Sequence, residues 1–292
     1  MIREHESAYP VRRMCRWVEV TASGYYAWRR RPESARDREN RRLLVSVRAL
    51  HEESRQSFGS PQVRRALRAS GWRVGRHRIA RLMRANGLVG QRPKRFRVTT
   101  QVGGSVPAAP DRLQREFTAS APNRVWVSDI TYVRTWQGWL YLACVLDLYS
   151  RRIVGWAAHS RITAELVVAA FRMAAVRRRP RRGLILHSDQ GKQYRSKDMA
   201  KALRSEGAVA SMGSVGDCYD NAAMERFFGS LKSEWLDERR YETRQEAARD
   251  IGAYLDGFYD SRRPHSTLGG LTPAAFEAKA RESQLGVHKF GA

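Results

Sequence analysis

Residues 124–160 have the sequence RVWVSDITYVRTWQGWLYLACVLDLYSRRIVGWAAHS, and this stretch decides the fold. Apolar and polar residues alternate over RVWVSDITYV, which is typical of a half-buried strand. After a turn at 136–138, GWLYLACVLDLYS is apolar and rich in β-formers, and RIVGWAAHS has the same character. Three such segments joined by short turns predict an antiparallel meander.

The segments that follow alternate between helix and strand patterns. We expect a helix from about Ala164 to Arg178, a strand at 184–189 (LILHSD), a helix at 196–207, a strand at 208–215 and a helix at 221–236. Three consecutive strands followed by this alternation predict a mixed five-stranded sheet with helices on its faces. The fold class is therefore α/β.

The N-terminal third has helical patterns. Residues 10–30 suggest a miniature helix-turn-helix with a turn at 21–24, and residues 39–87 suggest three longer helices, the last of them RHRIARLMRANG at 76–87. A glycine-containing turn at 71–75 before an arginine-rich helix is typical of a DNA-binding helix-turn-helix. The candidate DNA-binding residues are Arg76, Arg78, Arg81 and Arg84; a plain helical hairpin with solvated arginines is the alternative.

Charge points to a polyanionic partner. The chain has 292 residues, with 54 Lys and Arg against 29 Asp and Glu, and a formal net charge of +25. Half of the basic residues, 27, lie in residues 1–120 with only 10 acidic ones. This excess is too large for a typical enzyme of small metabolites, although a merely solvated basic surface is the alternative. Double-stranded DNA is the expected partner.

Cysteine usage and hydropathy indicate an intracellular protein. Cys15, Cys144 and Cys218 are far apart and form no CxxC pair, so neither a disulfide framework nor a zinc ribbon is expected. No apolar run approaches the roughly 18 to 20 residues needed to span a bilayer. We expect no membrane association and a cytoplasmic location near the nucleoid.

These patterns divide the chain into five parts. We expect a small helical segment at 1–32, a helix-turn-helix domain at 33–100, a linker at 101–122, a catalytic core at 123–240 and a helical tail at 241–292. The linker is predicted from GGSVPAAP, which follows a basic run and has the composition of an exposed connection.

Three acidic residues occupy positions suited to a shared site. Asp129 has the strand parity of Val127 and Val133, and Asp189 ends the strand at 184–189, where ligand sites of such sheets gather. Glu225 borders an apolar helical stripe formed by residues such as Phe228, at the edge that docks on the sheet. Lys232 lies two helical turns beyond Glu225 on the same face.

Carboxylates from two strands and a helix can hold hard divalent cations. Mg²⁺ prefers oxygen ligands, and two ions about 3.5–4 Å apart can activate an attacking oxygen and stabilise a leaving one. This chemistry cleaves or transfers phosphodiesters. Each acid taken alone could equally be a surface charge or the partner of an arginine.

The spacing of the acids resembles a known pattern. Between Asp189 and Glu225 lie 35 residues, and between Asp129 and Asp189 lie 59. This resembles the DDE recombinases whose core is like that of retroviral integrases, with the last two acids 35 residues apart on a ribonuclease-H-like fold. More closely, the chain resembles the OrfB protein of the insertion-sequence transposase family that makes its full transposase by frameshifting from an upstream OrfA. The blocks that match are FGSPQVRRAL (58–67), WVSDITYVRTWQGWLYLACVLDLYSRRIVGW (126–156), HSDQGKQYRS (187–196), DNAAMERFFGSLKSEW (220–235) and YDSRRPHSTLGGLTPAAF (259–276).

The resemblance implies a ribonuclease-H-like, integrase-type core and a transposase activity. It implies that Asp129, Asp189 and Glu225 bind two Mg²⁺ or Mn²⁺ ions and that Lys232 is the basic residue expected seven positions after the glutamate. The sequence lacks a long heptad zipper, which in this family belongs to OrfA. An OrfA partner or an OrfA–OrfB fusion, and a homo-oligomer on DNA, are therefore expected.

Two rival functions remain at this point. The first is a metal-dependent nuclease or resolvase with the same core, which would cleave DNA but never join it. The second is a DNA-binding regulator whose core is catalytically dead.

Several other residues have plainer expected roles. Asp147 is either an auxiliary acid or a strand-end charge facing Arg151 or Arg152, Asn221 and its neighbour Asp220 are expected to cap a helix, and Glu234 is expected to be solvated. The tryptophans of the strand region are expected to pack in the core or the hairpin: Trp126, Trp136, Trp139 and Trp156.

Overall fold

The computed structural model describes residues 1–91, 106–114, 116, 118–213, 221–237 and 239–289, and separates them into two compact units, Met1–Ser46 and Val47–Ala292. The first unit contains α1 (Ile2–His5), α2 (Val11–Trp17), α3 (Ala22–Arg30) and the start of α4 (Ala35–Glu53). The second contains α5 (Ser60–Ala69), α6 (Arg76–Ala85), β1 (Val125–Thr135), β2 (Gly138–Asp147), β3 (Ile153–His159), α7 (Ala164–Arg178), β4 (Ile185–Ser188), α8 (Lys197–Ser205), β5 (Val209–Met212), α9 (Ala222–Leu231), α10 (Arg244–Gly252) and α11 (Pro273–Lys289).

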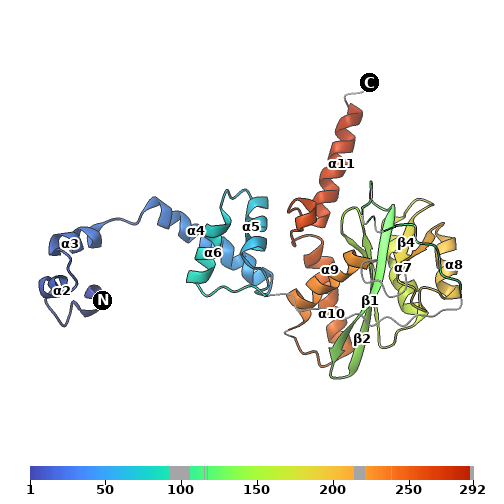
Figure 1. Ribbon diagram of the computed structural model, residues 1–292, viewed down its shortest axis with the longest axis horizontal. Coiled ribbons are helices and arrows are strands. Elements are labelled where there is room, and N and C mark those ends of the chain that lie inside the picture. Colours follow the sequence, from blue (N-terminus) through green and yellow to red (C-terminus); the bar gives the residue numbers. More distant parts are fainter. Residues whose placement is uncertain (92–105, 115, 117, 214–220, 238, 290–292) are drawn as a thin grey trace. The chain divides into compact units, whose positions relative to one another are not determined.

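A mixed five-stranded sheet is the centre of the second unit. Its strand order is β3-β2-β1-β4-β5. The first three strands are antiparallel, and β4 and β5 pair in parallel with β1 and with each other. Helices α7 and α8 lie on one side of the sheet and α9 and α10 on the other (Figure 1). The α/β prediction, the antiparallel meander and the bounds of α7 are confirmed.

Both faces of the sheet are buried, and the parity of the strands divides the side chains between them. Trp126, Ala143 and Val145 join the apolar cluster that contains Phe171 of α7. Residues of opposite parity, Val127 among them, are also fully buried and face the α9 side. This second face carries Asp129, whose parity matches that of Val127.

Gly155 lets α7 approach β3 closely. A Cβ atom at this position would lie 2.3 Å from the backbone oxygen of Ala170 and 2.6 Å from the backbone nitrogen of Ala174. Neither contact can be relieved by a side-chain rotation, so any larger residue must push the helix off the sheet.

We expect Gly155→Ala to lower the free energy of unfolding by about 1–3 kcal/mol, the usual cost of overpacking a core. Urea unfolding followed by circular dichroism measures the change. Gly257→Ala is the matched control, because a Cβ there meets nothing within 4 Å. A Gly155→Ala protein as stable as this control would contradict the close approach.

The helix-turn-helix expected at 39–87 is present. Helices α5 and α6 pack against each other, burying Val63 and Leu67 of α5 and Ile79 and Met83 of α6. In the first unit, α2 and α3 also form, but the turn expected at 21–24 is shorter. Thr21 caps α3 by accepting a hydrogen bond from the Gly24 N–H at 3.0 Å, so the helix begins at Ala22.

The helix-turn-helix region of the second unit docks on the C-terminal helices. Arg55, just after α4, donates hydrogen bonds of 2.8 and 3.1 Å to the carboxylate of Asp250 in α10. Its guanidinium also lies 3.4 Å from the ring centre of Trp235. Phe58 packs on Phe258 with ring centres 5.7 Å apart. These contacts hold the connection between α4 and α5 against the C-terminal helices.

Two helices continue as wider π turns. Helix α9 runs into η2 (Lys232–Leu236), and α10 runs into η3 (Ala253–Tyr259); the 3₁₀ turn η4 (Ser266–Leu268) precedes α11. Such π segments are rare and are frequent at functional sites. Within the described ranges, no helix is both long enough and apolar enough to cross a bilayer.

Candidate active site

The parallel pairing of β1 with β4 brings two of the candidate acids together. Val127 lies opposite His187, and continuing this register by two residues places Asp129 beside Asp189, which directly follows β4. Neighbouring strands are about 4.8 Å apart, and the equal parity puts both side chains on one face. Asp129 thus lies within β1, and Asp189 comes one residue after the end of β4, where the sequence placed it.

Backbone amides orient both carboxylates. Asp129 accepts a hydrogen bond of 2.7 Å from the N–H of Ile130, and Asp189 accepts one of 3.0 Å from the N–H of Gly191. A Cβ at Gly191 would lie 2.9 Å from the Asp189 Oδ1 atom. The loop after β4 therefore closes tightly around the Asp189 carboxylate.

Glu225 lies in the first turn of α9, on the same side of the sheet. The predicted apolar stripe of this helix is confirmed, because Met224, Phe227, Phe228 and Leu231 are all buried. Glu225 itself is half-buried at the border of that stripe, and burial raises its pKa.

Asn221 holds the start of α9 against β1. It occupies the N-cap position, but its side chain makes no cap hydrogen bond; the side-chain amide instead donates to the backbone oxygen of Ser128 at 3.2 Å. Ser128 directly precedes Asp129, so this bond ties the helix of Glu225 to the strand of Asp129. Sequence reasoning missed this role, because a polar residue before a helix predicts a cap. Asp220, expected as a second cap, lies outside the described residues.

The charges of the three acids act on one another. Burial and the negative charge of Asp189, with a smaller contribution from Glu225, raise the pKa of Asp129 to about 8. The N–H of Ile130 and the charge of Lys232 oppose the shift. The repulsion of the Asp129 carboxylate by those of Asp189 and Glu225 favours a bound cation, which would relieve it.

Lys232 lies at the edge of this acidic cluster. Its ammonium is 4.8 Å from the ring centre of Tyr132, above the face of that ring. Burial lowers its pKa, while Asp237 and Asp129 oppose the shift. The charge of Asp129 acts on Lys232, so a cation lies within electrostatic reach of the acids.

The acids are close enough to interact, yet within the described ranges no three His, Cys, Asp or Glu side chains are gathered into a ready metal-binding group. The donor set still fits a hard divalent ion, because every candidate ligand is a carboxylate oxygen. The strand pair supplies two of them side by side, and Glu225 reaches the group from a separate helix.

The candidate DNA-binding arginines lie on α6. Arg76, Arg81 and Arg84 are exposed, whereas Arg78 is half-buried. The first three are thus free of the core packing that involves Ile79 and Met83. Whether these side chains contact DNA stays a prediction.

The expectation for Glu234 is wrong, and that for Asp147 holds only in part, because its charge does act on Arg151. Glu234 is buried and paired with Arg263 at 2.6 Å instead of being solvated. Asp147 is fully buried and accepts backbone hydrogen bonds from Asn123 and Tyr149, with Arg178 at 3.8 Å. Arg152 turns instead to Asp260, at 3.0 Å.

Only some of the tryptophans that were expected to pack are buried. Trp126 is fully buried and Trp156 is half-buried. Trp136 at the tip of the β1–β2 hairpin is 71% exposed, and Trp139 is 45% exposed although its ring meets the edge of Tyr132. A hairpin that extends beyond the core leaves these rings without a buried surface to cover.

Comparison with known families agrees with this architecture. Residues 37–96 match a model described as an HTH-like domain, and residues 119–218 and 206–273 match two models described as integrase core domains. The catalytic core domain of HTLV-2 integrase, solved in complex with magnesium, is 16% identical, with a TM-score of 0.40 over 54% of this chain and 98% of that one.

Curated relatives align along almost the whole chain. An uncharacterized 31 kDa protein of insertion element IS600 from Shigella sonnei is 41% identical over 266 residues, 91% of this chain and 98% of its own length. The transposase InsF for insertion sequence IS3A from Escherichia coli K12 is 37% identical over 280 residues, 95% of this chain and 97% of its own. Together with the helix-turn-helix and the integrase core, these relatives show that the chain belongs to the IS3 family of insertion-sequence transposases.

Proposed function

We propose that this transposase cuts the phosphodiester at the ends of its insertion element and joins the freed 3′ hydroxyl to a second DNA site, with Asp129, Asp189 and Glu225 as its metal-binding acids. The observation that carries the proposal is the β1–β4 register, which aligns Asp129 with Asp189. The mutual effect of their charges supports the same assignment.

Bound Mg²⁺ or Mn²⁺, two ions in our proposal, would supply activation of the attacking oxygen and stabilisation of the leaving one. The protein's own side chains would hold these ions and position the phosphate. Asp129 and Asp189 present ligand oxygens from adjacent strands, and Glu225 presents one from α9. Lys232 binds a phosphate oxygen beside them. In each step a new P–O bond forms as another breaks, so no covalent protein intermediate is needed.

DNA recognition and assembly complete the proposal. The exposed arginines of α6, Arg76, Arg81 and Arg84, would contact duplex DNA with Arg78 at the margin, within a helix-turn-helix domain at 33–100 that precedes a core at 123–240. We infer that the chain acts in the bacterial cytoplasm, as a homo-oligomer on the element ends, and with an OrfA partner or as an OrfA–OrfB fusion. The family membership supports these inferences.

A strand-transfer assay separates this function from its rivals. We expect the full chain with Mg²⁺ to join a labelled, pre-cut 3′ end of the element to a target duplex, and EDTA to abolish both cleavage and joining while DNA binding persists. Denaturing gel electrophoresis separates the joined and cleaved products. Cleavage without any joining would identify a nuclease, and DNA binding without either reaction would identify a regulator.

A further inference from the structure

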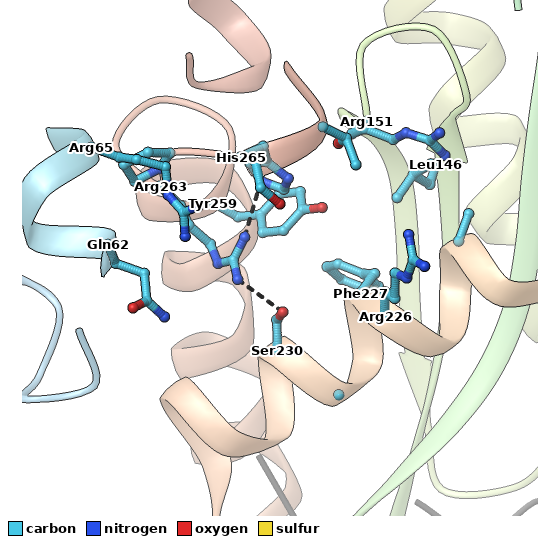
Figure 2. A pocket seen from close by; sticks show the side chains of 15 residues that line it. Gln62, Arg65, Leu146, Arg151, Arg226, Phe227, Ser230, Tyr259, Arg263 and His265 are labelled. Carbon is cyan, nitrogen blue, oxygen red and sulfur yellow. Dashed lines mark hydrogen bonds between the residues drawn. The ribbon is translucent and has the colours of Figure 1, made fainter. Parts of the chain in front are cut away.

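A cavity of about 600 Å³ lies beside α9, and its lining is rich in arginine (Figure 2). Arg65 comes from α5, Arg151 from the turn after β2, Arg226 from α9 and Arg263 from the segment after η3. We call it the arginine cavity. It is assembled from the helix-turn-helix region, the integrase core and the C-terminal segment, which are far apart in the sequence.

The positive charge of the arginine cavity is only partly neutralised. None of its fifteen lining residues is acidic. Arg263 is paired with Glu234, which does not line the cavity, and also donates to Ser230 at 2.9 Å. The Nε atom of Arg65 is buried and has no hydrogen-bond partner in the described part of the chain. An unsatisfied buried guanidinium N–H is costly unless a ligand accepts from it.

The cations of the cavity also repel one another. Burial and the charge of Arg263 lower the pKa of Arg65, and burial together with Arg226 lowers that of Arg151. Burial, and to a lesser degree the positive charges of three of these arginines, lower the pKa of His265 to about 3. The histidine is therefore neutral, and the arginines alone make the cavity attractive to an anion.

The backbone holds Arg151 at the cavity in an unusual conformation. Its φ is 62°, in the left-handed region that non-glycine residues rarely adopt, and its backbone N–H donates to the backbone oxygen of Asp147 at 2.8 Å. Such a conformation costs on the order of 1–3 kcal/mol, and it persists only where the surrounding structure fixes it. This cost fits a residue that must present its side chain in one direction.

The arginine cavity and the acid cluster lie on the same face of the sheet. Leu146, which lines the cavity, pairs with Val127, and Cys144 two residues before it pairs with Asp129. Arg226 directly follows Glu225 on α9, so one helix borders both sites. A DNA strand carries a phosphate about every 3.4 Å along the helix axis, so a strand that reaches the acids has further phosphates near the cavity.

We propose that the arginine cavity binds a backbone phosphate of the DNA strand that passes the acid cluster. The planar guanidinium can donate two parallel hydrogen bonds to a phosphate, which suits the arginines that line this space. The inference rests on the proposed function, because it takes the DNA of the transposition reaction as the ligand. Binding there also requires α5 to be docked on the core, since Arg65 comes from that helix.

The test compares DNA affinity of the full chain and an Arg65→Ala/Arg226→Ala variant, using a labelled random-sequence duplex in EDTA. Loss of a charged hydrogen bond to phosphate should weaken binding at least about tenfold. The plot of log affinity against log salt should become shallower by about 1 for each phosphate that the variant no longer binds. Fluorescence anisotropy at several salt concentrations measures both quantities.

The matched control is Arg172→Ala/Arg204→Ala, which removes the same charge from exposed positions on α7 and α8, across the sheet. A cavity variant with the affinity and salt slope of this control would overturn the inference. If the Arg65→Ala change prevents cooperative unfolding, the single variant Arg226→Ala is used instead, because Arg226 is exposed and its loss should not disturb the fold. A salt dependence shallower by about 1 in this variant supports the proposal, and a salt dependence equal to that of the control overturns it. Because no metal or cleavage is involved, this result stands apart from the test of the acids.

Discussion

Asp189→Asn is expected to leave the chain folded and bound to DNA but to lower cleavage and joining by about 10³-fold, since ligation of catalytic metal contributes several kcal/mol to the transition state. The amide has nearly the size of the carboxylate, and its oxygen can still accept from the Gly191 N–H. What is lost is the negative charge beside Asp129. Single-turnover cleavage of a labelled element end measures the rate.

Asp198→Asn is the control for the Asp189 experiment. Asp198 is exposed in the first turn of α8, so its neutralisation changes the net charge equally without touching the acid cluster. We expect cleavage by this variant to stay within about twofold of the wild type, because exposed helix-end charges contribute only a few tenths of a kcal/mol.

DNA affinity of Asp189→Asn should be unchanged or raised, because a negative charge near the phosphates is gone. Undiminished cleavage in Asp189→Asn would remove the metal-site proposal.

Glu234→Ala is expected to have the largest effect on stability, a loss of about 3–5 kcal/mol in the free energy of unfolding. Glu234 is buried and accepts two hydrogen bonds of 2.6 Å from Arg263. Removing it leaves the Arg263 guanidinium largely buried without a counter-charge. Urea unfolding measures the loss.

An exposed ion pair provides the comparison for Glu234. Arg177 and Asp256 pair at 2.9 Å with both side chains over 40% exposed, so Asp256→Ala should cost only about 0–1 kcal/mol. A Glu234→Met/Arg263→Met variant should recover much of the lost stability, because apolar residues can replace a buried ion pair. Equal losses for Glu234→Ala and Asp256→Ala would show that the buried pair is not structural.

The fold was predictable where local pattern and packing agree. Alternation at 124–133 predicts β1, and the apolar stripe of Met224 and Phe228 predicts how α9 faces the sheet. The position of Asp129 follows from the same alternation. These features depend on residues close together in the sequence, which is why one sequence suffices to find them.

Long-range partners were not predictable in the same way. Glu234 was expected to be solvated because its helix neighbours do not reveal Arg263, which lies 29 residues later. Asp147 was expected to be an auxiliary acid or to face Arg151 or Arg152, whereas its carboxylate lies 3.8 Å from the guanidinium of Arg178 on α7. The arginine cavity needs four separate elements, so no local pattern indicates it. Nor does the sequence show that η2 forms a π turn directly after α9.

The pairing of β1 with β4 has an evolutionary consequence. Because three ladder positions fix Asp129 against Asp189, the length of the chain between them has no part in setting their separation. Inserted residues in the exposed turn at 181–183 would lengthen a surface loop and leave the two carboxylates where they are. Lineages can therefore vary in this interval while keeping the same chemistry.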